Sequence, residues 1–143
     1  MFDCREDADA LLHNHQVKLD GVLDIQLLEV KDRIRLHGYT TIRSLKHCLE
    51  LYTIGDPTLL NIKVNGRSSM DPNGRVWGKR PLVENLLKYA VVDVVALFTL
   101  YNKLEWKLSH QRWKEVSHRY CDKDRSRNRS YRDGSNRLPP GIF

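Results

Sequence analysis

The sequence contains few cysteines and no long apolar run. Its 143 residues include three cysteines, Cys4, Cys48 and Cys121, and no two of them form a Cys-x-x-Cys pair. Such spacing disfavours both a disulfide framework and a structural zinc site. No apolar run approaches the length of a membrane span, and the first residues, MFDCREDADALL, lack the basic and apolar segments of a signal peptide. We therefore expect an intracellular protein, cytoplasmic or nuclear, with reduced cysteines and no membrane partner.

Acidic residues are outnumbered by basic ones, and the excess is concentrated near the C-terminus. The formal net charge is +6, and residues 119–137 contain seven Lys or Arg against three Asp. Arg125, Arg127 and Arg129 belong to this segment, which also contains two tyrosines. Arginines can neutralise phosphates and aromatic rings can stack on bases, so the segment is a candidate for nucleic-acid binding. A solvated extension without a ligand is the alternative that the composition leaves open.

The hydrophobic pattern predicts mostly helices. The first four residues resemble the end of a strand, and the stretch from Gly66 to Arg80 is rich in turn residues and predicts a loop. Pro81 stands at a natural first position for the longest helix, whose inner stripe we expect to contain Leu82, Leu86, Ala90, Leu97, Tyr101 and Leu104. The expected helices cover residues 5–15, a segment ending at Gly38, residues 40–55, a segment opened by Asp56 and Pro57, and residues 81–110.

Tyr89 and Asp93 stand four residues apart on the longest predicted helix and therefore share one face. Their neighbours are strongly apolar, so the carboxylate needs a polar partner, a metal ion or an exposed edge of the helix. A carboxylate that binds a divalent ion, beside a phenol that positions water, is a workable phosphodiester site. A half-buried tyrosine with a solvent-exposed aspartate is the structural alternative.

Two stretches of the chain resemble the 3′-to-5′ exonucleases of the DEDD class, in the ribonuclease D branch. The stretch VWGKRPLVENLLKYAVVDVV has the Trp, Arg-Pro-Leu and Tyr-Ala-x-x-Asp-Val order of the third exonuclease motif. The stretch FDCREDADALLHNHQVKLDGVLDIQLLE resembles the second motif and its sequel, in which a strand delivers an Asp-x-Gln, here Asp24 to Gln26. The resemblance covers residues 1–108 and is nearest to exonuclease-domain proteins of the Egalitarian and piRNA-biogenesis type.

The resemblance implies roles for particular residues. Asp93 would be the third-motif metal ligand, Tyr89 the water-orienting phenol of the DEDDy subtype, and Asp7 the second-motif carboxylate. These residues would serve two Mg²⁺ or Mn²⁺ ions. Lys79 and Arg80 are candidates for contact with substrate phosphate, although a solvated pair at a helix entrance is an equal interpretation. The expected partner is single-stranded nucleic acid, RNA in preference to DNA, and a protein partner is also considered.

The family's first motif, Asp-x-Glu on the first strand, does not occur in these 143 residues. We therefore expect an α/β ribonuclease H-like fold that is incomplete at its N-terminus, mostly helical with one or two remaining strands. Residues 1–108 would form a partial exonuclease domain and residues 109–143 a basic C-terminal extension. Two hypotheses follow: an exonuclease whose hydrolysis is impaired unless the missing strands come from elsewhere, and a catalytically inactive module that binds nucleic acid or a partner protein.

Overall fold

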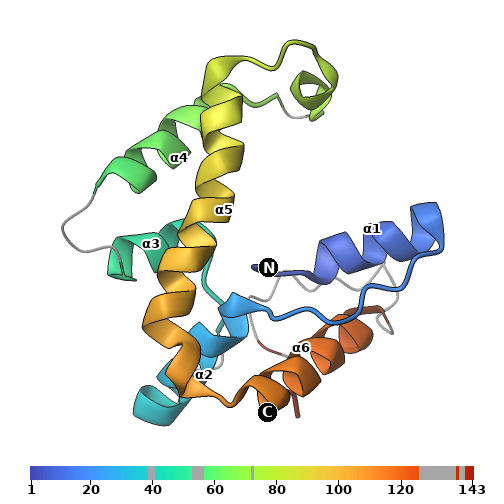
Figure 1. Cartoon of the computed structure of the whole chain (residues 1–143), viewed down its shortest axis with the longest axis vertical. Coiled ribbons are helices and arrows are strands. Elements are labelled where there is room, and N and C mark those ends of the chain that lie inside the picture. Colours follow the sequence, from blue (N-terminus) through green and yellow to red (C-terminus); the bar gives the residue numbers. More distant parts are fainter. Residues whose placement is uncertain (39–40, 53–56, 72, 126–137, 139–140) are drawn as a thin grey trace. The chain divides into compact units, whose positions relative to one another are not determined.

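A computed structural model describes the chain except residues 39–40, 53–56, 72, 126–137 and 139–140 (Figure 1). The chain divides into two compact units, a first unit made of residues 1–43 and 104–143 and a second unit made of residues 44–103. The helices are α1 (Arg5–His15), α2 (Ile25–His37), α3 (Leu45–Tyr52), α4 (Thr58–Ser68), α5 (Glu84–Leu104) and α6 (His110–Arg125), with 3₁₀ turns η1 (Arg75–Gly78) and η2 (Glu105–Lys107).

Helix α1 of the first unit has the predicted bounds. Glu6 and Asp7 lie in its first turn, where the helix dipole favours carboxylates. Gln16 follows the helix in the left-handed conformation with φ of 56°, and its backbone N–H donates to carbonyls of the last turn. The expectation of a helix over 5–15 is thereby confirmed.

Helix α2 is closed at both ends by the residues that mark its limits in the sequence. The Asp24 side chain accepts a hydrogen bond from the Gln26 N–H at 3.0 Å, which caps the N-terminus. Gly38 ends the helix with φ of 70°, as predicted, and donates its N–H to the Ile34 carbonyl. Inside α2, buried Glu29 makes a bidentate ion pair with Arg33, one turn on, and also pairs with Arg43.

The expected strand at the N-terminus is wrong for the residues that the structure describes. The Met1 amino group donates to the Leu23 carbonyl at 2.8 Å, and the Ile25 N–H donates to the Met1 carbonyl at 2.9 Å. These bonds pair two short segments, but Asp3 has φ of 54° and α1 begins at Arg5, so the pairing ends before a strand forms. Thr41 forms a single bridge, and no strand occurs among the described residues, so the α/β expectation is only partly met.

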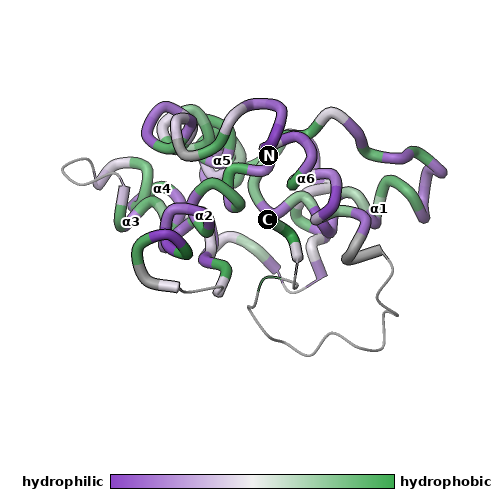
Figure 2. Tube along the Cα trace, turned by 90° about the horizontal axis from the view of Figure 1, so that it is seen from below, coloured by the Kyte–Doolittle hydropathy of each residue, from purple (hydrophilic) through white to green (hydrophobic). Residues whose placement is uncertain are grey.

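Helix α6 completes the core of the first unit. Its residues are mostly hydrophilic (Figure 2), yet Trp113, Val116 and Tyr120 are fully buried. Val116 and Tyr120 pack against Leu27 and Val30 of α2, and Leu138 and Ile142 join the same cluster. Helix α6, Leu138 and Ile142 all lie within residues 109–143, so this part of the chain contributes to the core of the first unit. The division into a partial exonuclease domain over 1–108 and a basic C-terminal extension over 109–143 stays a prediction.

The longest helix, α5, belongs almost wholly to the second unit and differs from its prediction in bounds and in face. It begins at Glu84 rather than Pro81 and ends at Leu104, because Leu108 is extended and Ser109 leads into α6. The buried residues of α5 are Leu86, Val92, Ala96, Leu100 and Leu104. Of the predicted inner stripe, Leu86 and Leu104 are fully buried, whereas Leu82, Ala90, Leu97 and Tyr101 are half-buried.

An apolar face of α5 is exposed in the second unit. Its large residues are Leu87, Val91, Val94, Val95 and Phe98, and Phe98 is 68% exposed. The apolar residues of α5 therefore surround the helix, so periodicity alone cannot say which side is inside. No helix of the described residues is long and apolar enough to span a membrane.

Helices α3 and α4 accompany α5 in the second unit. Helix α3 is shorter than the predicted 40–55 and buries Cys48 and Leu49, while the predicted closing residue, Gly55, lies outside the described residues. Helix α4 follows Pro57 as expected and extends to Ser68. The first residues of the predicted loop at 66–80 are therefore helical, and four more of its residues form the 3₁₀ turn η1.

Candidate active site

Tyr89 and Asp93 lie on the side of α5 that carries its buried residues. Both are half-buried, and the Asp93 side chain is 39% exposed. They share this side with Leu86, Val92 and Ala96, which follow the same three- and four-residue spacing. The two residues singled out by the sequence thus form a pair on one face, turned toward α4.

Lys63 of α4 is the polar partner that Asp93 requires. Its ammonium forms an ion pair with Asp93 Oδ1. The same nitrogen lies 4.2 Å from the centre of the Tyr89 ring, which is cation–π geometry. Lys63 is only 13% exposed, so much of its side chain is enclosed. Sequence reasoning missed Lys63, because it precedes Asp93 by thirty positions and belongs to another helix.

Gly66 lets α4 approach α5 at Tyr89. A Cβ atom at position 66 would lie 2.5 Å from the Tyr89 Cβ and 2.7 Å from its Cδ2. Real Cβ atoms do not approach other carbons so closely, so only glycine fits at this crossing. Gly66 stands three residues after Lys63, and the two residues therefore lie on the same face of α4.

Trp77 provides a second aromatic ring beside Tyr89. It lies on η1, and the two ring centres are 6.3 Å apart with planes inclined by 56°. Aromatic pairs favour such tilted arrangements over face-to-face stacking. Gly74 opens η1 in the left-handed conformation, with φ of 65°, which its lack of a side chain allows.

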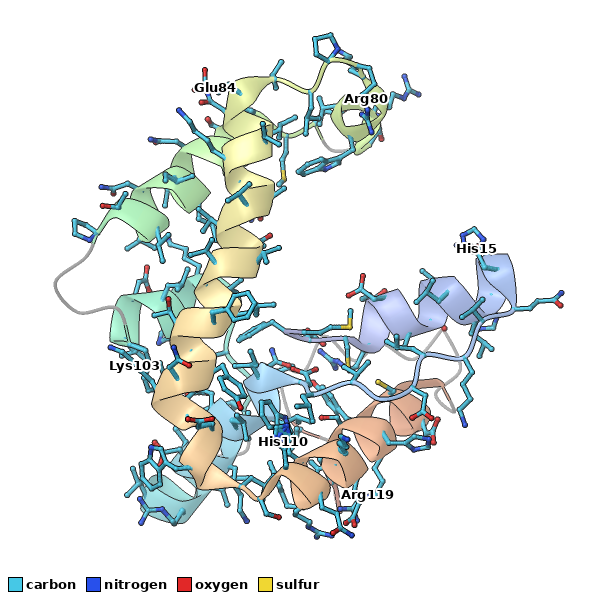
Figure 3. All side chains as sticks on the ribbon, in the orientation of Figure 1. His15, Arg80, Glu84, Lys103, His110 and Arg119 are labelled. Atoms are coloured by element: carbon cyan, nitrogen blue, oxygen red, sulfur yellow. The ribbon has the colours of Figure 1, made fainter. Side chains whose placement is uncertain are left out.

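Basic side chains accompany this aromatic pair. Residues 63–80 contain five Lys or Arg, at positions 63, 67, 75, 79 and 80, against one acidic residue, Asp71. Lys79 and Arg80 are exposed, and Arg80 precedes α5, whose first turn contains Glu84 (Figure 3). Arg80 Nη1 donates to the carbonyls of Trp77 and Lys79, each at 2.8 Å, so its guanidinium also closes the end of η1.

Asp7 belongs to the first unit, whereas Tyr89 and Asp93 belong to the second. It is exposed on the first turn of α1. The structure therefore brings together two of the three proposed catalytic residues, Tyr89 and Asp93.

Asp24 is a fully buried carboxylate with a structural role, because it caps the N-terminus of α2. Its oxygens accept N–H bonds from Asp3, Cys4 and Gln26 at 3.1, 2.9 and 3.0 Å. Burial raises the pKa of Asp24 above its usual range, against the opposing effect of these bonds. The expected strand leading to Asp24 is thus replaced by a helix cap, and the side chain of Asp24 is already occupied.

Only part of the predicted basic contact region can be placed. Arg125 is the last residue of α6, and Arg127 and Arg129 lie outside the described residues. Arg119 lies on α6 (Figure 3) and is half-buried.

The described residues do not form a complete site for a divalent metal ion. Mg²⁺ and Mn²⁺ prefer several oxygen ligands, and no group of three or more His, Cys, Asp or Glu side chains among the residues described here is close enough to hold an ion. Asp93 stands with a cation as its neighbour rather than with a second carboxylate. The metal roles of Asp7 and Asp93 therefore stay predictions.

The comparisons with known proteins agree with the motif order. A family model described as 3′-5′ exonuclease matches residues 1–109, which is most of the chain. Comparison with curated proteins and with solved structures finds no significant match. The matched segment contains α1 through α5 and hence Asp7, Tyr89 and Asp93. The chain belongs to the 3′-5′ exonuclease family, whose domain has the ribonuclease H-like fold and acts on nucleic acid.

Proposed function

We propose that this chain acts on single-stranded nucleic acid, RNA in preference to DNA, as a 3′-5′ exonuclease domain of the ribonuclease D branch. The observation that carries this proposal is the pair of Tyr89 and Asp93 on one face of α5, with Trp77 beside Tyr89. The motif order of the DEDDy subtype supports it, and the nearest resemblance is to proteins of the Egalitarian and piRNA-biogenesis type.

Nucleic acid would bind through the basic residues and aromatic rings of the second unit. Lys79 and Arg80 are exposed and close in sequence to Trp77, so they suit phosphates next to a stacked base. Arg125, Arg127 and Arg129 would add phosphate contacts. Because base stacking and phosphate neutralisation are largely independent of base identity, the binding tolerates different sequences.

Asp93 and Asp7 are the proposed ligands of Mg²⁺ or Mn²⁺. A bound divalent ion in such enzymes supplies a water molecule activated for attack on the phosphodiester. In this chain the Lys63 ammonium pairs with Asp93 Oδ1, and its positive charge opposes the approach of a metal ion to that carboxylate. Together with the lack of an Asp-x-Glu motif in the 143 residues, this pairing supports impaired hydrolysis.

The Lys63–Asp93 ion pair also favours a second candidate function, a catalytically inactive module that binds nucleic acid or a partner protein. In that case Lys63 would permanently fill the position of a metal ion. The Tyr89 ring, which lies against Lys63, would then serve packing and stacking only.

One experiment separates the two functions. A single-stranded RNA labelled at its 5′ end is incubated with the chain in Mn²⁺ or Mg²⁺ and in EDTA, and both shortening from the 3′ end and binding are measured. The first function predicts slow, metal-dependent shortening by the wild type, and none by Asp93→Ala. Binding without shortening supports the second function. Equal shortening by Asp93→Ala contradicts the first function. Failure to bind RNA contradicts the first function and the RNA-binding form of the second, and leaves a module that binds a partner protein.

The contribution of the basic tail is best tested by substitution. Residues 119–125 belong to α6, and Leu138 and Ile142 lie in the core, so truncation would damage the first unit. Arg127→Gln with Arg129→Gln leaves those core residues intact. The double variant should bind RNA more weakly and with a smaller dependence on salt than the wild type.

A further inference from the structure

Cys4 and Cys121 bring two thiols into contact inside the first unit. Their sulfur atoms are 3.1 Å apart, although the residues are separated by 117 positions. Both side chains are buried, and with Ala8 they form a small cluster against Leu19 and Val22. A disulfide bond requires sulfurs about 2 Å apart, so bond formation needs a movement of roughly 1 Å.

The backbone around both cysteines is fixed by one hydrogen-bond network. The Cys4 N–H donates to Asp24 Oδ2 at 2.9 Å, and the Asp24 N–H donates to Ser117 Oγ at 2.9 Å. Ser117 stands one helical turn before Cys121 on α6. Asp24 therefore links the segment that carries Cys4 to the helix that carries Cys121, and the native fold holds the two sulfurs together.

A small cavity gives access to Cys121. It has a volume of about 80 Å³, and its lining includes Cys121 together with Lys114, Ser117 and His118. A water molecule occupies about 30 Å³ in the liquid, so the cavity can hold a molecule of two heavy atoms. The lysine, serine and histidine side chains offer hydrogen-bond donors to an oxygen of such a molecule. Cys4 does not line the cavity.

We propose that Cys4 and Cys121 are a modification site that a peroxide converts into a reversible disulfide, with Cys121 reacting first. The Cys121 thiol attacks hydrogen peroxide, the O–O bond breaks, and a sulfenic acid and one water form. The Cys4 thiol then attacks the sulfenic sulfur, and its proton leaves with the hydroxyl group as a second water. Each peroxide molecule is thus reduced by two electrons, and a thiol such as glutathione restores both cysteines.

The microenvironment of Cys4 is consistent with the second role. Its hydrogen bond with Cys121 and its burial raise the pKa of Cys4 well above its usual range. Cys4 therefore remains a protonated thiol until its neighbour is oxidised. The new bond would connect the residue that precedes α1 to α6, and so tie the helix that carries Asp7 to the core of the first unit.

The third cysteine provides a matched control. Cys48 is buried on α3 of the second unit, so Cys48→Ser retains the reactive pair. The folded chain is treated with hydrogen peroxide, residual thiols are blocked with N-ethylmaleimide, and the products are analysed by mass spectrometry. Wild type and Cys48→Ser should each lose two thiols and two hydrogen masses, and digestion should yield a peptide linking Cys4 to Cys121.

Two further variants test the order of the steps. Cys4→Ser should accumulate a sulfenic acid at Cys121 that dimedone traps, whereas Cys121→Ser should show no oxidation at Cys4. In 6 M urea the Cys4–Cys121 bond should form much more slowly in Cys48→Ser, because the fold no longer holds the sulfurs together. A linkage through Cys48, retention of both thiols by folded Cys48→Ser, or equal rates with and without urea would overturn the proposal. These readings do not depend on nuclease activity.

Discussion

Substitution of Gly66 by alanine tests the close crossing of α4 and α5. The added Cβ would meet the Tyr89 Cβ at 2.5 Å and its ring at 2.7 and 2.9 Å, so one helix must shift. Overpacking of this kind destabilises by about 1–3 kcal/mol. The higher helix propensity of alanine offsets about 1 kcal/mol of that loss. We therefore expect Gly66→Ala to lower the free energy of unfolding by up to about 2 kcal/mol.

The assay is urea unfolding followed by circular dichroism, with Gly78→Ala as the matched control. A Cβ at Gly78 meets no atom within 4 Å, so this variant should unfold at the wild-type midpoint or slightly above it. In Gly66→Ala the fluorescence of Trp77 should also change, because its neighbour Tyr89 is displaced. A Gly66→Ala chain as stable as both wild type and Gly78→Ala would refute the crossing geometry.

Two more predictions concern the first unit. Because burial raises the pKa of Asp24 above 3.8, the folded state binds this proton more tightly than the unfolded state, and the contribution of Asp24 to stability falls as pH rises above that value. Asp24→Asn lacks this titration, so the wild-type free energy of unfolding minus that of the variant should decline in urea melts as the pH rises above about 4; a constant difference would contradict it. Trp113→Phe removes the indole N–H that donates to the Asp24 carbonyl at 2.8 Å and leaves space in the core, so it should destabilise by about 2–3 kcal/mol. Trp106, which is 68% exposed, supplies the control Trp106→Phe, and equal melting temperatures for the two variants would contradict the buried role of Trp113.

Local signals were sufficient to predict the first two helices. The acidic first turn of α1 and the glycine that ends α2 act through nearby backbone groups, so the sequence contains all the relevant information. The cap at Asp24 is also local, but the resemblance directed attention to a strand there. The cap also depends on tertiary contacts that the sequence does not show, because the N–H groups of Asp3 and Cys4, about twenty positions away, donate to the Asp24 side chain.

Only the part of the candidate site that α5 provides could be predicted from the sequence. The spacing of Tyr89 and Asp93 places both on one face of a helix whatever surrounds it. Which face is covered depends on Gly66 and Lys63 of α4, and the apolar residues all round α5 give no periodic signal that would show it.

Helix α6 shows how composition can conceal a core element. Its high content of charged residues favoured a solvated extension. Trp113, Val116 and Tyr120 nevertheless recur at three- and four-residue spacing, which is the signature of a buried helix face. This spacing is the sequence signal that could have predicted the buried face of α6.

In the proposed exonuclease, Asp93 is the carboxylate that binds the divalent ion, and Lys63 restrains it by pairing with it. The most direct measurement compares the rate at which 5′-labelled single-stranded RNA is shortened in Mn²⁺ by wild type, Lys63→Met and Asp93→Asn. Methionine keeps the length of the lysine stem but removes the ammonium that pairs with Asp93. We expect several-fold faster shortening by Lys63→Met and none by Asp93→Asn. Unchanged or slower shortening by a folded Lys63→Met chain, or wild-type shortening by Asp93→Asn, would contradict it.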